Sequence, residues 1–162
     1  AGPADVIDFL RIQSRPFLFT ASGVPAAVGA ALAATRICRS EEGPALFARV
    51  LENARYLNEG LRALGFHVVD QVALPDGTHV ATPIVPVLVA DDWKAALLWK
   101  ALYEAGVYVN VALHPAVPPG GALLRTSVMA THERATIDEA LAAFADVKRA
   151  FEAQHGPLPS AH

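Results

Sequence analysis

The sequence predicts an α+β domain in which helices cover one side of a small, mainly antiparallel sheet. Two observations support this fold class. A long apolar stripe at helical spacing runs from 45 to 64, and four short β-rich segments follow it, with one helical segment among them and another after the last. The expected strands lie at 66–69, 82–89, 107–111 and 122–128.

Local signals set the limits of these elements. The apolar stripe ends at Gly65, which favours a helix C-terminus. Asp91 is placed to cap a helix that ends at Gly106, and the last helix is expected to end near 154. Pro83 and Pro86 favour an edge strand or an irregular entry, because proline has no N–H to donate to a sheet.

The residues before this domain are expected to form separate helices. One helix is expected up to Ile12, with Pro16 stopping it and a connector after it. The next is entered through Pro25, runs to about 39, and is rich in small apolar residues, so we expect it to be buried against a partner domain, with Cys38 as a small buried residue. The pair 43–44, glycine then proline, marks a break before the following helix.

Composition argues against several classes of function. The 13 basic and 16 acidic side chains give a net charge of -3, which is unlike that of a nucleic-acid-binding protein or a protein bound to an anionic membrane. The most apolar run, 24–38, is too short and too weakly hydrophobic to cross a bilayer. One cysteine cannot form an internal disulfide, so we expect a reducing cytoplasm. The histidines lack metal-ligand spacing, and no metal site is expected.

Six motifs occur in a fixed order along the chain. They are RPFLFTAS at 15–22, TPIVPV at 82–87, GVYVN at 106–110, PAVPPG at 115–120, LLRTS at 123–127 and ATH at 130–132. Their order and spacing resemble the C-terminal part of the α-oxoamine synthases. These are acyltransferases that depend on pyridoxal 5'-phosphate (PLP), have fold type I, and include serine palmitoyltransferase and glycine C-acetyltransferase.

The resemblance implies a domain organisation and a reaction. Residues 1–42 would form the end of the PLP-binding large domain and an inter-domain helix, 43–155 the C-terminal small domain, and 156–162 a frayed tail. The full-length enzyme would condense serine, glycine or alanine with an acyl-CoA or acyl-carrier-protein thioester, usually with decarboxylation. It would be a homodimer with shared active sites.

Arg125 is the strongest candidate for substrate binding. A planar guanidinium on a strand can hold a carboxylate through two parallel hydrogen bonds. From the residue alone, an ordinary ion-paired arginine would be the favoured interpretation, but the resemblance implies that Arg125 binds the carboxylate of the amino acid. Holding this group would orient the bonds at the substrate Cα relative to the PLP ring.

Thr20, Ala21 and Ser22 are the candidate cofactor-binding residues. Their hydroxyl and N–H groups precede a helix N-terminus, which suits a phosphate. The resemblance implies that this phosphate belongs to PLP bound in the partner subunit. Without the resemblance, Ser22 would be interpreted as a helix cap.

Other polar and aromatic residues are given structural interpretations. His132 matches a histidine of the family and is expected to tie a loop to a helix end. Four aromatic residues are expected to pack in the core: Trp93, Trp99, Tyr103 and Tyr108.

The chain's three lysines fall on expected helices, and none has the sequence context of a Schiff-base lysine. They are Lys94, Lys100 and Lys148. PLP chemistry needs such an amine, which the resemblance places upstream of Ala1, so we expect this chain to be a piece of a longer enzyme and inactive alone.

Two alternatives and one departure from the family remain. The chain could come from an aminotransferase of the same fold, or be a non-catalytic subunit that supports a catalytic partner. Leu113 stands where serine palmitoyltransferase and 8-amino-7-oxononanoate synthase carry an arginine, which weakens the assignment to serine palmitoyltransferase and leaves the substrate open.

Overall fold

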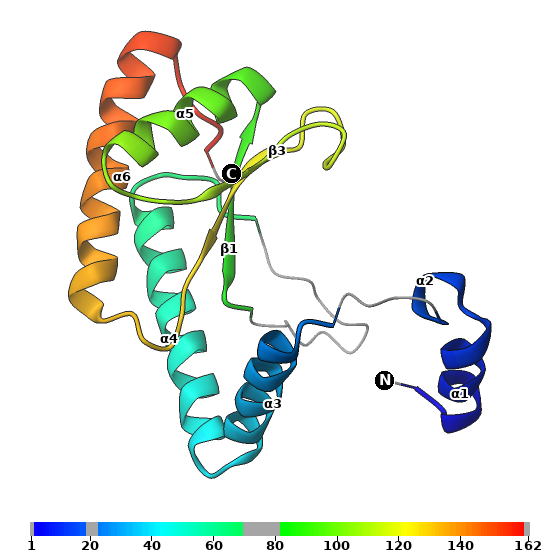
Figure 1. The fold of residues 1–162 in the computed structure, drawn as a ribbon. Helices are drawn as coiled ribbons and strands as arrows, with labels where there is room; N and C mark the ends of the chain where they lie inside the picture. Colours follow the sequence, from blue (N-terminus) through cyan, green and yellow to red (C-terminus); the bar gives the residue numbers. More distant parts are fainter. Residues whose placement is uncertain (1, 19–22, 70–81, 161–162) are drawn as a thin grey trace, which may run out of the picture. The chain divides into compact units, whose positions relative to one another are not determined.

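The computed structural model describes residues 2–18, 23–69 and 82–160 (Figure 1). Contacts divide the chain into two compact units, Ala1–Pro44 and Ala45–His162. Within the described ranges, no helix combines the length and the apolar character needed to cross a membrane.

The first unit consists of helices with exposed surfaces. They are α1 (Ala4–Gln13), α2 (Arg15–Leu18) and α3 (Pro25–Arg39), followed by the start of α4 (Glu42–Ala63). A connector was expected to begin directly after Pro16, but Phe17 and Leu18 still belong to α2. Proline is tolerated in the first turn of a helix, so Pro16 does not prevent this. The N-cap residue of α3 is Val24, which makes no side-chain cap hydrogen bond. Cys38 is exposed, contrary to expectation.

The turn from α3 into α4 is tighter than the sequence predicts. The helix α4 begins at Glu42 and includes Gly43 and Pro44, which were expected to form a break. A Cβ atom on Gly43 would lie 2.2 Å from the carbonyl oxygen of Cys38, so only glycine fits this turn. Proline follows in the first helical turn, where its missing N–H has no helical partner to lose.

The second unit contains the predicted antiparallel sheet. Its strands are β1 (Ile84–Ala90), β2 (Asn110–Ala112) and β3 (Ala122–Ser127), in the order β1-β3-β2. The expected strand at 66–69 is reduced to one bridge, between Val68 and Val87. The strand expected from 107 begins three residues later, because the N–H of Val107 still bonds to Leu102 at the end of the preceding helix.

Helices cover one face of this sheet (Figure 1). The helix α5 (Asp92–Glu104) follows β1 and is capped as predicted, since Asp91 accepts a hydrogen bond of 2.7 Å from the N–H of Lys94. The helix α6 (Arg134–His155) packs beside α5 and the second half of α4. The largest fully buried side chains of the resulting core include Phe66, Phe144, Leu61, Leu98, Leu102 and Leu124.

Two expectations about burial are wrong at the ends of this unit. The predicted stripe of α4 is buried only in its second half, while Leu46, Phe47 and Leu51 are exposed. The tail beyond Gly156 does not fray at Leu158, which is buried and donates a 3.0 Å hydrogen bond from its N–H to Glu152.

Candidate substrate-binding site

The sheet has a second face, opposite to the helices, and the middle strand β3 presents polar groups there. Ala122, Leu124 and Thr126 of β3 are buried on the helix side. Their neighbours alternate to the other side, where Arg125 and Ser127 are exposed. The register is fixed from the buried side, since the Thr126 hydroxyl donates a 2.6 Å hydrogen bond to the Val85 carbonyl.

Arg125 lies at the centre of this open face. Pairing of the strands places it between Pro86 of β1 and Asn110 of β2. Its guanidinium makes no hydrogen bond or ion pair with any residue in the described part of the chain. The nearest side chains of β1 and β3 on this face carry no charge: Ile84, Leu88 and Leu123 are apolar, and Ser127 has a hydroxyl. A cation without an acidic neighbour on an apolar surface is suited to binding an anion from outside.

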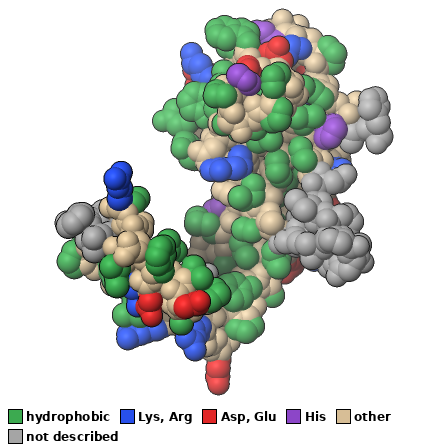
Figure 2. Space-filling view, turned by 90° about the vertical axis from the view of Figure 1, so that its right-hand side faces the viewer, with side chains coloured by type: hydrophobic (Ala, Val, Ile, Leu, Met, Phe, Trp, Pro, Cys, Tyr) green, Lys and Arg blue, Asp and Glu red, His purple; other side chains and the backbone are tan. Residues whose placement is uncertain are grey.

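In the space-filling view, charged side chains are scattered among apolar and other side chains (Figure 2). Apolar side chains are spread over much of the visible face, and the basic side chains are separated from one another. Among the residues of the three described strands, Arg125 is the one that carries a charge, so the sheet offers a single guanidinium rather than a basic patch.

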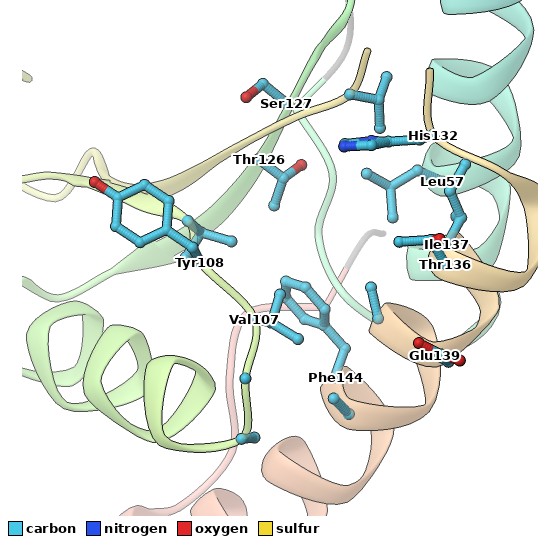
Figure 3. Close-up of a pocket in the computed structure, with 16 residues that line it drawn as sticks. Leu57, Val107, Tyr108, Thr126, Ser127, His132, Thr136, Ile137, Glu139 and Phe144 are labelled. Atoms are coloured by element: carbon cyan, nitrogen blue, oxygen red, sulfur yellow. The ribbon is translucent and has the colours of Figure 1, made fainter. Parts of the chain in front are cut away.

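A cavity of about 380 Å³ lies on the helix side of the sheet, beside the segment that leads into β2 (Figure 3). Phe144 and Ile137 of α6 line it together with Val107 and Thr126. The hydroxyl of Tyr108 points away from it. Because most of the lining is apolar, this cavity belongs to the packing between α6 and the sheet edge.

The turn after β3 is fixed by a buried amide. Asn53 of α4 is 7% exposed, and its Nδ2 donates to the carbonyls of Met129 and His132, both at 3.0 Å. The Nδ1 of His132 in turn accepts from the N–H of Met129 at 3.4 Å. These contacts tie the turn to α4, in the structural role expected of His132, and they hold the end of the strand that carries Arg125.

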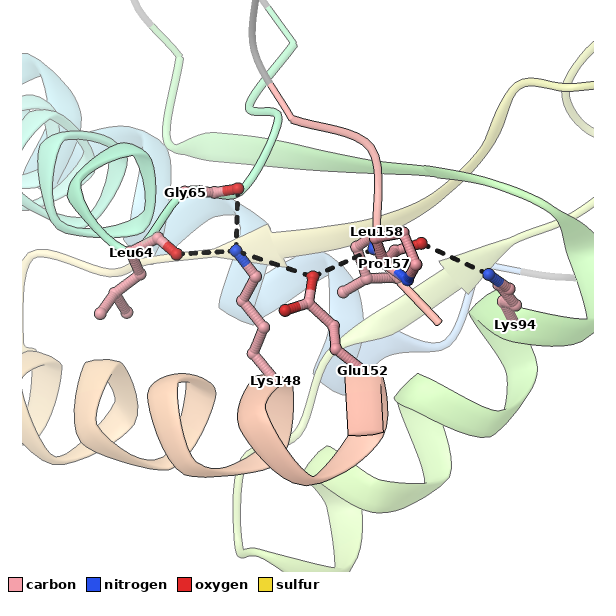
Figure 4. Close-up of polar contacts among 7 residues, drawn as sticks. All are labelled: Leu64, Gly65, Lys94, Lys148, Glu152, Pro157 and Leu158. Atoms are coloured by element: carbon pink, nitrogen blue, oxygen red, sulfur yellow. Dashed lines mark hydrogen bonds and ion pairs between the residues drawn. The ribbon is translucent and has the colours of Figure 1, made fainter. Parts of the chain in front are cut away.

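Each of the three lysines is engaged by neighbouring groups. Lys94 donates to the Pro157 carbonyl at 3.3 Å, and Lys100 pairs with Glu104 at 3.7 Å. Lys148 donates to the Leu64 and Gly65 carbonyls at 2.8 and 3.0 Å (Figure 4).

Other predicted positions have different outcomes. Thr20, Ala21 and Ser22 lie outside the described residues. Of the aromatic residues expected in the core, only Trp99 packs there, and its indole N–H donates to the Val109 carbonyl. The others are exposed: Trp93, Tyr103 and Tyr108. Within the described ranges, no cluster of three or more His, Cys, Asp or Glu is placed to hold a metal ion.

Comparison with known proteins decides the family. Residues 1–144 match the family model of aminotransferase class I and II. The chain belongs to this family. It is 42% identical to an 8-amino-7-oxononanoate synthase from Symbiobacterium thermophilum, over 92% of the chain and 35% of that protein. It is 34% identical to a serine palmitoyltransferase from Bacteriovorax stolpii, over 94% of the chain and 34% of that protein.

Solved structures of this aminotransferase class I and II family share the fold. A serine palmitoyltransferase from Sphingomonas wittichii aligns with a TM-score of 0.72 and 35% identity, over 94% of the chain and 35% of that structure. One from S. paucimobilis, with bound PLP and myriocin, aligns with a TM-score of 0.76 and 36% identity, over 90% and 34%. The chain thus spans about a third of the length of these relatives and matches their C-terminal part, which confirms the predicted resemblance and fold class.

Proposed function

We propose that this chain is the C-terminal part of a PLP-dependent α-oxoamine synthase, which condenses serine, glycine or alanine with an acyl-CoA or acyl-carrier-protein thioester. Similarity to an 8-amino-7-oxononanoate synthase and to serine palmitoyltransferases, over about nine-tenths of the chain, supports this reaction class. The observation that carries the proposal is the exposed Arg125 on the open face of the sheet.

Arg125 would bind the carboxylate of the amino-acid substrate. Its neighbours across the sheet, Pro86 and Asn110, carry no negative charge that would neutralise it. When the rest of the protein covers this apolar face, exclusion of water would strengthen the attraction between guanidinium and carboxylate. The central position on the sheet limits the movement of the arginine backbone, so the bound carboxylate would fix the orientation of the substrate.

The described residues fit the substrate better than they fit the cofactor. A bound PLP would supply an electron sink for the bonds at the substrate Cα. The amine that PLP needs is not offered by Lys94, Lys100 or Lys148, because each is engaged on the helix side or the helix ends of the unit. We therefore assign that lysine to the rest of the protein, and the phosphate contacts to the segment with Thr20, Ala21 and Ser22.

The reaction class is tested by incubating the full-length protein, loaded with PLP, with an amino acid and an acyl-CoA. Release of free thiol that depends on both substrates is the expected result. Formation of an oxo acid from the amino acid without thiol release would instead identify an aminotransferase. A protein with neither activity nor PLP absorbance would contradict the proposal and favour a supporting subunit.

The assembly of the protein is tested separately from its reaction. We propose a cytoplasmic homodimer whose active sites are shared between subunits. Sedimentation of the full-length protein is expected to give the mass of a dimer. Mixing a variant that lacks Arg125 with one that lacks the Schiff-base lysine is expected to restore activity if the two groups come from different subunits, and to leave it abolished otherwise.

A further inference from the structure

Asn110 is the polar side chain closest to Arg125 in the strand pairing. It is the first residue of β2, and the register places it directly opposite Arg125 of β3. Directly opposite residues of an antiparallel pair share one face of the sheet, with Cβ atoms about 4.5–5.5 Å apart. Both side chains are exposed, so the amide and the guanidinium are neighbours on the open face.

Of the two residues that pair with Arg125 across the sheet, only Asn110 has a polar side chain. On the other side of Arg125 stands Pro86, which has no polar side-chain atom. The hydroxyl of Tyr108 lies 3.5 Å from Oδ1 of Asn110, so it donates to the amide oxygen and leaves the NH₂ group of Asn110 to face other partners. An uncharged donor beside Arg125 adds hydrogen bonds for an anion without cancelling the positive charge.

A carboxylate can accept more hydrogen bonds than the two that a bidentate guanidinium donates to it. Its two oxygens offer about four lone-pair sites, and a bidentate arginine occupies two of them. We propose that Nδ2 of Asn110 donates to the same substrate carboxylate that Arg125 binds, which makes Asn110 a substrate-binding residue. This inference rests on the proposed function of Arg125.

The inference is tested with Asn110→Ala and Asn110→Asp in the full-length, PLP-loaded protein. The affinity for the amino acid is measured by calorimetry and by titration of the cofactor absorbance. Asn110→Ala is expected to raise the Kd for the amino acid about tenfold, the effect of one hydrogen bond to a charged group. Asn110→Asp preserves the shape of the side chain, but the new carboxylate pairs with Arg125 and repels the substrate, so a rise of about a hundredfold is expected.

Three controls make the result specific. Gln154→Glu introduces the same amide-to-acid change at an exposed position at the end of α6, and is expected to leave the affinity unchanged. The KM for the acyl thioester is expected to stay constant in the Asn110 variants. In the Arg125→Ala background, Asn110→Ala is expected to lose most of its effect, because the two groups act on one carboxylate.

The outcomes separate this inference from the proposed function. If Arg125→Ala weakens amino-acid binding while both Asn110 variants behave like Gln154→Glu, the role of Asn110 is refuted and that of Arg125 stands. If Arg125→Ala has no effect on binding, the proposed function of Arg125 fails as well.

Discussion

Removing the ammonium group of Lys148 is expected to destabilise the second unit. This side chain is 17% exposed, and its Nζ donates to the two carbonyls at the end of α4, Leu64 and Gly65 (Figure 4). It also lies 3.9 Å from Glu152, which holds the tail, and 4.9 Å from the centre of the Phe66 ring. The lysine therefore joins α6 to the C-terminus of α4 and to the loop after it.

The magnitude follows from these contacts. Lys148→Met keeps the aliphatic stem but leaves two helix-end carbonyls without this donor. Hydrogen bonds to a charged group contribute about 1.5–3 kcal/mol each, and water can replace part of the loss at this half-buried position. We expect the free energy of unfolding to fall by roughly 2–3 kcal/mol.

The assay is urea unfolding of the chain followed by circular dichroism, with Lys100→Met as the matched control. Lys100 is 67% exposed and pairs only with Glu104 on the same helix, at 3.7 Å, among the contacts of the described residues. Its loss is expected to change the free energy of unfolding by less than about 0.5 kcal/mol. Equal effects of the two substitutions would refute the reasoning about Lys148.

Two further predictions concern contacts of α4. Asn53→Ala removes the two hydrogen bonds to the turn after β3 and is expected to lower the free energy of unfolding by about 1–3 kcal/mol. Asn58→Ala, measured in the same urea assay, is expected to have a smaller effect, because among the described residues Asn58 bonds only to Arg62 of its own helix. The hydrogen bond from Tyr56 to Asp138 raises the pKa of Tyr56 above its ordinary 10.0, so its stabilising contribution is complete below pH 10.0 and is lost as the pH rises through the raised pKa. In an ultraviolet titration of the wild-type protein, the ionisation of Tyr56 is expected above pH 10.0, and this step is expected to be missing in Tyr56→Phe. A wild-type titration without such a step would contradict the assignment.

Local signals predicted much of the second unit. Gly65 and Gly106 end their helices with φ of 77° and 86°, and Asp91 caps α5, because each of these effects depends on a few neighbouring residues. The strand expected at 122–128 is confirmed by β3, but the strand pairing was needed to show which of its side chains are buried, because Leu123 and Leu124 are both apolar and Thr126 is buried.

Features that depend on distant residues could not be predicted in this way. The residues that accept hydrogen bonds from the buried Asn53 lie 76 and 79 residues further along the chain. No sequence pattern around Asn53 therefore predicts its burial. Leu158 is buried because it packs into the core formed by residues from other elements of the unit, which no pattern around it predicts. The pairing of Asn110 with Arg125 follows from the order of the strands, which the sequence did not specify.

The sequence also could not predict which apolar helix faces are exposed. The apolar pattern of α3 predicts a buried helix, yet none of its residues is buried in the first unit. Periodicity shows that a face is apolar but does not show which element covers it, or whether that element belongs to the same stretch of chain.

The most direct test of the account compares an amino acid with its carboxamide as ligands of the full-length, PLP-loaded protein. The two ligands differ only at the group that Arg125 is proposed to hold, where the carboxamide has no charge and an NH₂ group replaces one carboxylate oxygen. The wild-type protein is expected to bind the amino acid more tightly by roughly 2–4 kcal/mol, about thirtyfold to a thousandfold, and Arg125→Ala is expected to abolish that preference while PLP stays bound. A preference that persists undiminished in Arg125→Ala would show that another group recognises the carboxylate.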